Sequence, residues 1–311
     1  MNAFLITLSA VGVLLLTAAP GFLLIKSKKV GEDFISGFSK VLLFVCQPCL
    51  AIYTFSNAEF SKEMLLDIAI FLLLTIAIHA IMLGFSCLVL RRRFKDASYR
   101  ILTIASSFTN CAFFGIPIIE ALLPESAAGL ILYTTVYATV MNILGWTVGS
   151  AIIAGDSRYI TAKNVFINPT MLGVVIAVPL FVFSVSLPSD LADMIAIIGR
   201  MTTPISMLIM GMRLATTSAR TVFLSLRTYL AVLAKGFIMP LCGFLLALLV
   251  PLPTEVKLTF FIICACPTAS IVLNFSELIG EAQREAASSV LLSTMLSIVT
   301  LPIMVLLLPL L

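Results

Sequence analysis

Long apolar stretches separated by short polar connections run along the whole chain of 311 residues. About 20 apolar residues are enough for a helix to cross the hydrocarbon of a bilayer. The pattern predicts ten such helices, numbered one to ten in chain order, over residues 3–25, 34–56, 67–90, 101–123, 129–153, 168–187, 190–213, 227–250, 257–279 and 287–310. Hydrophobic residues make up 61% of the chain and charged residues 11%, so the pattern excludes a soluble domain and predicts an all-α, multi-pass membrane protein.

Helices four and nine are predicted to be broken near mid-depth. Helix four contains Asn110, Gly115 and Pro117, and helix nine contains Cys266 followed by Pro267. Proline lacks an amide hydrogen and its ring clashes with the carbonyl four residues earlier, so we expect Pro117 and Pro267 to begin new half-helices. A break frees backbone groups that hydrocarbon cannot satisfy, so it persists only where protein or water satisfies them. Both breaks are therefore candidate parts of a binding site.

Special residues recur in the two halves of the chain at a nearly constant offset. At about 156 residues the offset pairs Pro48 with Pro204, His79 with Lys235, the break near Asn110 with the break at Pro267, and, at 155, Asn142 with Ser297. Because five helices precede the joint, the second half must insert with the opposite orientation. We therefore predict two inverted five-helix repeats, at 1–153 and 168–311, joined by a linker at 154–167, with broken helices four and nine crossing near the bilayer midplane.

The predicted crossing favours an anionic substrate. Two half-helices would point their N-termini at one place, and each N-terminus offers about half a positive charge and unpaired amides. The polar side chains nearest to the breaks or facing them are expected to donate further hydrogen bonds, and they are Asn110, Asn142, Thr268, Ser270 and Asn274. Phe113 or Phe114 would supply an apolar wall.

Ionisable residues within the predicted helices need an explanation, since a charge at the bilayer centre costs about 3 kcal/mol or more. Lys235, near mid-depth, either takes part in transport or pairs with carbonyls that a break frees. Arg200 either attracts an anion or serves a helix or subunit contact. His79 either transfers a coupling proton or is a satisfied polar residue between helices, and Glu277 is the better carboxylate candidate for coupling. Lys40 is expected to extend its ammonium to the membrane surface.

Basic residues occupy alternate connections between the predicted helices. One side holds fourteen of them, Lys26, Lys28, Lys29, Arg91, Arg92, Arg93, Lys95, Arg100, Arg158, Lys163, Arg213, Arg220, Arg227 and Arg284. The other side holds only Lys62 and Lys257. The positive-inside rule makes the first side cytoplasmic and places both termini outside. The net charge of +4 therefore reflects topology and indicates no nucleic acid partner.

No disulfide, metal or other cofactor is predicted. All seven cysteines lie within predicted helices, where no oxidising machinery acts. Cys46 and Cys49 have the spacing of a redox or metal motif, but small residues at a helix contact explain them better.

Four segments together resemble the auxin efflux carrier family, within the bile/arsenite/riboflavin transporter-like superfamily. They are NCAFFGIPIIEALL from Asn110, NILGWTVG from Asn142, CPTASIVLNFSELIG from Cys266 and VLLSTMLSIVTLP from Val290. The resemblance covers nearly the whole chain. Members include plant auxin exporters and bacterial carriers of malate or malonate, and the short linker between the repeats is typical of the bacterial type.

The resemblance implies a fold and a mechanism. It implies ten helices in two inverted repeats, usually a homodimer, with helices one, two, six and seven as a scaffold. Helices three to five and eight to ten would form a transport domain that moves as an elevator. The resemblance assigns Asn110 and Pro117 to the first crossover and Pro267 to the second, with Asn142 and Ser297 beside them.

The sequence therefore predicts a secondary transporter of a small organic anion, such as malate, malonate or an auxin-like acid, in an inner or plasma membrane. A sodium-coupled symporter of the bile-acid type is the alternative, but it needs carboxylates near the breaks, and none lies within two residues of Asn110 or Pro267. A membrane sensor of a metabolite or lipid needs a longer extramembrane segment. An enzyme is disfavoured by the absence of an HExxH motif. Substrate, direction and coupling to protons or sodium stay open.

Overall fold

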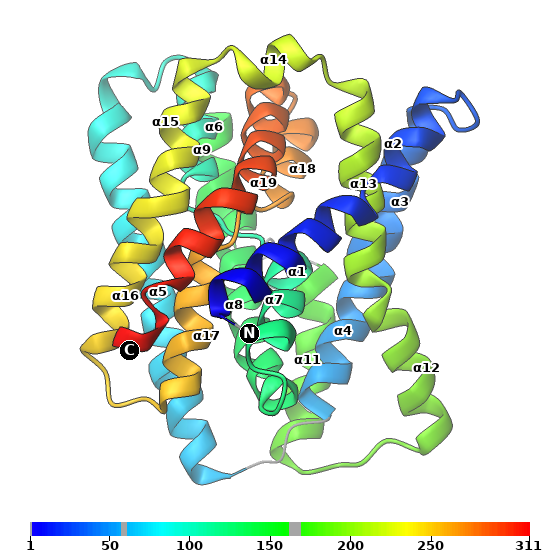
Figure 1. The fold of residues 1–311 in the computed structure, drawn as a ribbon, viewed down its shortest axis with the longest axis vertical. Coiled ribbons are helices and arrows are strands. Elements are labelled where there is room, and N and C mark those ends of the chain that lie inside the picture. Colours follow the sequence, from blue (N-terminus) through cyan, green and yellow to red (C-terminus); the bar gives the residue numbers. More distant parts are fainter. Residues whose placement is uncertain (1, 57–60, 162–168) are drawn as a thin grey trace.

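The computed structural model describes the whole chain except residues 1, 57–60 and 162–168 (Figure 1). The described residues form an all-helical protein with one isolated β-bridge. Seven helical runs among them are long and apolar enough to cross a membrane, namely Ala3–Lys26, Asp33–Ser56, Lys62–Arg93, Ala127–Ala154, Ser189–Thr216, Leu226–Leu248 and Gln283–Leu310. Two shorter apolar helices, Cys111–Leu122 and Met171–Val182, accompany them. The prediction of a multi-pass helical membrane protein is confirmed.

The helices follow the predicted apolar stretches in order. The first half contains α1 (Ala3–Thr17), α2 (Ala19–Lys26), α3 (Asp33–Val41), α4 (Gln47–Ser56), α5 (Lys62–Leu90), α6 (Ala97–Ala105), α7 (Ile116–Leu122), α8 (Ala127–Leu144) and α9 (Ser150–Ala154). The second half contains α11 (Pro169–Val182), α12 (Ser189–Arg200), α13 (Thr202–Thr216), α14 (Ala219–Phe223), α15 (Leu226–Leu233), α16 (Met239–Leu248), α17 (Thr254–Ala265), α18 (Ile271–Ile279) and α19 (Gln283–Val305). Short 3₁₀ turns occupy η2 (Arg91–Arg93), η5 (Ser157–Tyr159) and η7 (Leu308–Leu310).

Wide π-helical turns interrupt several of these helices. They are η1 (Leu42–Cys46), η3 (Cys111–Gly115), η4 (Gly145–Gly149) and η6 (Ala234–Ile238). Three of them end two residues before a proline, at Pro48, Pro117 and Pro240. A wider turn makes room for a proline ring that would clash with the carbonyl four residues earlier, so the helix continues past the proline.

The helices form two groups (Figure 1). In the first group α13 packs against α2, and both α11 and α12 pack against α4. Glycines bring these backbones into contact: a Cβ on Gly211 would lie 1.8 Å from the carbonyl oxygen of Ala18, and one on Gly173 would lie 2.6 Å from the Cα of Pro48. Such close approach is typical of helix packing in membranes.

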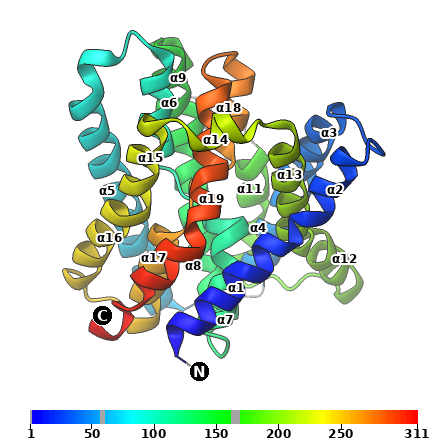
Figure 2. The same ribbon diagram turned by 45° about the horizontal axis from the view of Figure 1, so that its top comes forward.

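The second group contains the remaining long helices. Here α5 packs against α8, α16 against α17, and α15 against α19. Helix α1 leaves the first group and crosses α7 and α19, as Figure 2 shows from a second direction. Besides α1, direct contacts of α4 and α11 with α8 and of α13 with η3 (Cys111–Gly115) connect the two groups.

The basic connections lie together at one end of the molecule. The turns between α2 and α3, between α5 and α6, and from α13 through α14 to α15 all lie at the upper end of Figure 1, and the connection between α16 and α17 lies at the lower end. The connections with most of the basic residues therefore share one end, as the charge pattern predicts.

Candidate functional site

The helices predicted over 101–123 and 257–279 are both interrupted, and their interruptions touch. Helix α6 ends at Ala105 and the chain becomes helical again at Cys111, while α17 ends at Ala265 and α18 begins at Ile271. Thr109 and Thr268 form an antiparallel β-bridge between the two breaks. Beside it, the Asn110 amide donates to the Pro267 carbonyl at 2.7 Å, and the Ala269 amide donates to the Phe108 carbonyl at 3.1 Å.

The prediction that Pro117 and Pro267 begin the second half-helices is wrong by several residues. The first of these half-helices begins at Cys111, and Pro117 lies inside it, in the first turn of α7. The wider π-turn η3 lets the helix continue past the proline. In it the Gly115 amide donates to the Asn110 carbonyl, five residues earlier, at 3.2 Å. Pro267 lies in the extended link before α18, where its carbonyl accepts the Asn110 amide.

Side chains satisfy the carbonyls that the break in the ninth predicted helix frees. Pro267 has no amide to give to the Ile263 carbonyl, which instead accepts the Thr109 hydroxyl at 2.8 Å. The Thr268 amide, which a continuous helix would direct at the Cys264 carbonyl, donates to Ser293 Oγ at 2.9 Å. The break is therefore stabilised by groups from elsewhere in the fold, as burial in a membrane requires.

Lys235 supplies the missing donor at the same helix end. Its Nζ donates to the carbonyl oxygens of Cys264 at 2.9 Å and Cys266 at 2.5 Å, and the residue is completely buried. A positive charge at the C-terminus of α17 also complements the helix dipole. Of the two interpretations of Lys235, the structure shows the pairing with freed carbonyls.

The break in the fourth predicted helix has the matching arrangement. The Thr268 hydroxyl donates to the carbonyl of Ala105, the last residue of α6, at 2.9 Å. Thr109 and Thr268 therefore each cap the first half of the other interrupted helix. The exchange is reciprocal, since each break satisfies a carbonyl at the end of the other helix's first half.

Two buried polar groups at the crossing lack a partner among the residues that the structure describes. Asn110 Nδ2 is one, although the residue is only 3% exposed. His79 Nε2 is the other: its Nδ1 lies 2.7 Å from the Thr75 carbonyl oxygen, and its ring packs against Phe108 of the break. A buried polar atom without a partner is costly, so both atoms are available to a ligand or water.

A cavity of about 350 Å³ lies between α3, η1 and α4 on one side and α8, η4 and α18 on the other. Its polar lining includes Lys40, Gln47, Asn142, Asn274 and Glu277, and Trp146 and Phe275 add aromatic faces. A smaller cavity of about 20 Å³ shares Ser39 and Asn274 with it and adds Phe113, Arg213 and Ser270. The first residue of α18, Ile271, lines the larger cavity.

Some of the predicted site residues line the two cavities, and others do not. Asn142, Asn274 and Glu277 share the larger cavity, and Phe113, rather than Phe114, lines the smaller one. Phe114 is fully buried in the core. Ser297 donates to the Thr294 carbonyl of its own helix at 2.6 Å.

Glu277 forms a two-pronged ion pair with Arg213. The distances from its oxygens to the guanidinium nitrogens are 2.5 and 3.1 Å, and the pair connects α18 to α13 across the two helix groups. Sequence reasoning assigned neither Arg213 nor Lys40 to the site. No local signal relates residues 64 positions apart, and only the fold brings them together.

Arg200 lines a different cavity, of about 570 Å³, between α4 and α12. Its Nη2 donates to the Tyr53 hydroxyl at 2.6 Å, and the guanidinium lies over the Tyr53 ring at 5.1 Å from the centroid. Asp193 lines this cavity too. The contact of Arg200 is therefore with a neighbouring helix.

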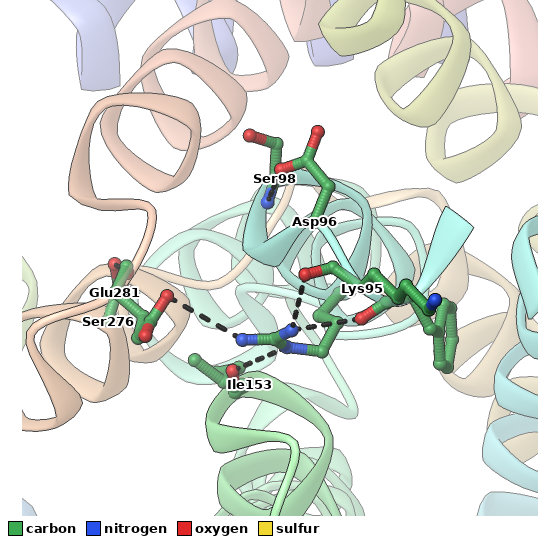
Figure 3. A network of polar contacts seen from close by, with 8 residues as sticks. Lys95, Asp96, Ser98, Ile153, Ser276 and Glu281 are labelled. Carbon is green, nitrogen blue, oxygen red and sulfur yellow. Dashed lines mark hydrogen bonds and ion pairs between the residues drawn. The ribbon is translucent and has the colours of Figure 1, made fainter.

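Arg100 joins α6 to α9 and to the residues that follow α18, at the side remote from the crossing. Figure 3 shows its partners Lys95, Ile153 and Glu281. Its guanidinium donates to the carbonyl of Ile153 at 2.9 Å and to that of Phe94 at 2.9 Å, and lies 3.6 Å from the Glu281 carboxylate. Beside it the Ser98 amide donates to Asp96, which holds the pKa of that carboxyl below its usual range. Three helices that surround the crossing are thus connected at one end.

Residues 6–305 match the model of a family described as membrane transport protein. A comparison with curated proteins found no match. The family model covers nearly the whole chain, and the long apolar helices are consistent with a membrane protein. The chain therefore belongs to this membrane transport protein family, the auxin efflux carrier family, and is a membrane transporter rather than an enzyme.

Proposed function

We propose that the chain is a secondary transporter of a small organic anion, such as malate, malonate or an auxin-like acid. The observation that supports this most is the meeting of two interrupted helices at Thr109 and Thr268, beside the unpartnered amide of Asn110. In membrane transporters such breaks form substrate sites, because unwound backbone and half-helix ends supply polar groups where hydrocarbon cannot.

The charge around the cavity favours an anion. The N-terminus of α18 begins at the cavity wall and points positive partial charge and amides into this region. Lys40 adds a full charge, whereas Glu277 is already paired with Arg213. A carboxylate would accept hydrogen bonds from the side-chain amides of Asn142 and Asn274, and Trp146 would contact its apolar part.

The packing supports the two inverted repeats. Helices one and seven meet through α2 and α13, and helices six and two meet through α11 and α4, so the pairing is preserved when the repeats are exchanged. The reciprocal threonine contacts at the breaks follow the same exchange. We therefore retain ten helices in two repeats, at 1–153 and 168–311, with the linker 154–167 partly outside the described residues.

Alternating access follows from the position of the larger cavity. It lies between the proposed scaffold, helices one, two, six and seven, and the proposed transport domain, helices three to five and eight to ten. Sliding of the transport domain along the scaffold would move the site across the membrane, as in an elevator. A homodimer, an inner or plasma membrane location and outward-facing termini complete the proposal.

The sodium-coupled alternative gains no support from the breaks. Carbonyl oxygens at a broken helix are natural ligands for a sodium ion, but Lys235 already donates to those of Cys264 and Cys266. A coupling proton could still use His79, whose Nε2 is unpartnered.

Counterflow in proteoliposomes tests the proposal. The wild-type protein should exchange at least one member of a panel of mono- and dicarboxylates. Asn142→Ala, Asn274→Ala and Lys40→Gln should each lower apparent affinity about tenfold, since a hydrogen bond to a charged group contributes about 1.5–3 kcal/mol. Lys26→Gln is the matched control, because Lys26 lies over the Phe22 ring at the end of α2 and lines neither cavity.

Two outcomes would contradict the proposal in different ways. Exchange of no carboxylate by the wild-type protein would reject the substrate class. Normal exchange by all three variants would reject the site. Repeating the assay under pH and sodium gradients identifies the coupling ion, and a His79→Gln carrier that still concentrated substrate on a proton gradient would exclude His79 from coupling.

A further inference from the structure

A pocket rich in arginine lies at the basic end of the molecule, away from the crossing. It has a volume of about 780 Å³, and four arginines line it, Arg93 of η2, Arg220 of α14, Arg227 of α15 and Arg284 of α19. We call it the arginine pocket. Neither membership of the transporter family nor the proposed transport site assigns a function to this pocket.

Two of the four arginines are already held by one aromatic ring. Arg93 donates to the Tyr99 hydroxyl at 2.5 Å, and Arg93 and Arg227 both lie over the Tyr99 ring, at 5.2 and 4.8 Å from its centroid. Arg227 also lies 3.5 Å from the Asp96 carboxylate. These contacts fix the two guanidinium groups before any ligand arrives, which lowers the entropy cost of binding.

The guanidinium groups of the other two arginines have no hydrogen bond or ion pair with any residue in the described part of the chain. Arg220 and Arg284 are both exposed. They line the same pocket although they lie 64 residues apart in the sequence. The one carboxylate in the lining is Glu285. Glu285, together with the Asp96 that pairs with Arg227, offsets two of the four arginine charges, which leaves a net positive charge at the pocket.

A buried hydroxyl provides a second, independent observation. Thr228 lines the arginine pocket, is 0% exposed, and its Oγ1 has no partner among the described residues. Buried hydroxyls are normally hydrogen-bonded, so this one is available to a bound acceptor or donor. The pocket wall is also fixed in place, because Ser288 Oγ of α19 donates to the Thr221 carbonyl of α14 at 3.1 Å.

Three leucines also line the arginine pocket. Leu224, Leu226 and Leu230 are 70%, 74% and 64% exposed. Exposed leucines beside arginines, at the membrane-surface end of an apolar helix, match the boundary between acyl chains and headgroups.

We propose that the arginine pocket binds a phosphate group, and that the phosphate belongs to the headgroup of an anionic membrane lipid. Arginine forks match phosphate oxygens in geometry and charge, and basic pockets between transmembrane helices are suited to lipid headgroups. The leucines select the lipid over free phosphate, because they would contact the acyl chains. The site connects α14, which follows the proposed scaffold helix α13, to α15 and α19 of the proposed transport domain.

Titration of the purified full-length protein in detergent tests this, and does not depend on transport. The probes are dioctanoyl phosphatidylglycerol, dioctanoyl phosphatidylcholine, glycerol 3-phosphate and inorganic phosphate, and the readouts are melting temperature and bound lipid counted by native mass spectrometry. Phosphatidylglycerol should raise the melting temperature saturably and bind at one site, whereas the zwitterionic lipid and the two soluble phosphates should bind at least about tenfold more weakly.

Variants locate the site. Arg220→Gln with Arg284→Gln should weaken phosphatidylglycerol binding about tenfold or more by removing two charge-assisted donors, and Thr228→Val should weaken it less. Arg158→Gln, at an exposed arginine paired with Asp156, should bind normally. Unchanged binding by the double variant, or equal binding of phosphatidylcholine, would overturn the proposal. Equal affinity for inorganic phosphate would overturn the lipid assignment.

Discussion

Thr109 and Thr268 face each other across two interrupted helices, and each donates its hydroxyl to a carbonyl at the end of the other helix's first half. The contact therefore fixes both the register of the two breaks and the place where the helices meet.

Replacing Thr109 by valine should destabilise the protein. Valine has nearly the same shape but cannot donate, so the buried Ile263 carbonyl would lose its hydroxyl partner and keep only the Cys266 amide, at 3.1 Å. We expect a loss of about 1–3 kcal/mol, seen as a lower melting temperature in detergent. Thr109→Ser retains the hydroxyl and should lose clearly less, and equal melting of the two variants would show that the hydrogen bond contributes nothing.

Removing the ammonium of Lys235 tests whether its hydrogen bonds stabilise the fold by more than the burial of its charge destabilises it. Lys235→Met leaves the Cys264 carbonyl without a side-chain donor, at a cost of about 1–3 kcal/mol, but also removes a charge whose burial is costly. Because two short hydrogen bonds and a helix C-terminus compensate the charge, we expect a net loss of stability. Lys62→Met, at an exposed helix start, should melt as the wild type does. A Lys235→Met protein that melts higher would mean that the lysine is kept for transport and not for folding.

The sequence was sufficient to predict the breaks but not their geometry. Apolar stretches of about 20 residues identify the spans, and Asn110 and Pro267 lie at the two breaks, whereas the helix continues past Pro117. The actual start of the first half-helix, at Cys111, depends on a π-turn that tertiary packing permits: a Cβ on Gly115 would lie 3.5 Å from the Cys266 sulfur. That contact joins residues 151 positions apart, so no local pattern contains it.

Contacts between residues far apart in the sequence also explain which site residues the sequence pattern did not predict. Asn142 and Asn274 are polar residues in apolar helices, and such residues stand out in any hydropathy pattern. Lys40 and Arg213 lie at helix ends, where basic residues are common and usually reach water. Only the fold places α3 and α13 across the cavities from α18 and so brings these residues to the cavity walls.

Arg100 is expected to stabilise the end of the proposed transport domain. Arg100→Gln would leave the Ile153 carbonyl without its donor and separate α6 from α9, which we expect to cost about 1–2 kcal/mol, mostly through the two carbonyl contacts. The half-exposed Glu281 should contribute little. Hydrogen exchange should rise at the end of α18 and in α9. If it rose equally in Arg158→Gln, the loss of charge at this end, and not the contact, would be responsible.

Glycine at position 211 is required for the contact between α13 and α2, and a pair of alanine variants separates this from an effect on helix formation. A Cβ on Gly211 would lie 1.8 Å from the Ala18 carbonyl oxygen and 2.9 Å from the Phe22 nitrogen, and backbone atoms cannot move aside as a side chain can. Gly211→Ala should therefore force the helices apart and lower stability by about 1–3 kcal/mol or more.

Gly84 of α5 is the matched control for Gly211. It has nothing within 4 Å of its Cβ position, so Gly84→Ala should gain the ordinary helix preference of alanine, about 0.5–1 kcal/mol. The two substitutions are chemically identical and both lie in apolar helices, so opposite shifts in melting temperature can only come from the space around each glycine. Shifts of the same sign would mean that the contact between α13 and α2 is looser than the structure shows, and the proposed rigid scaffold would lose its main support.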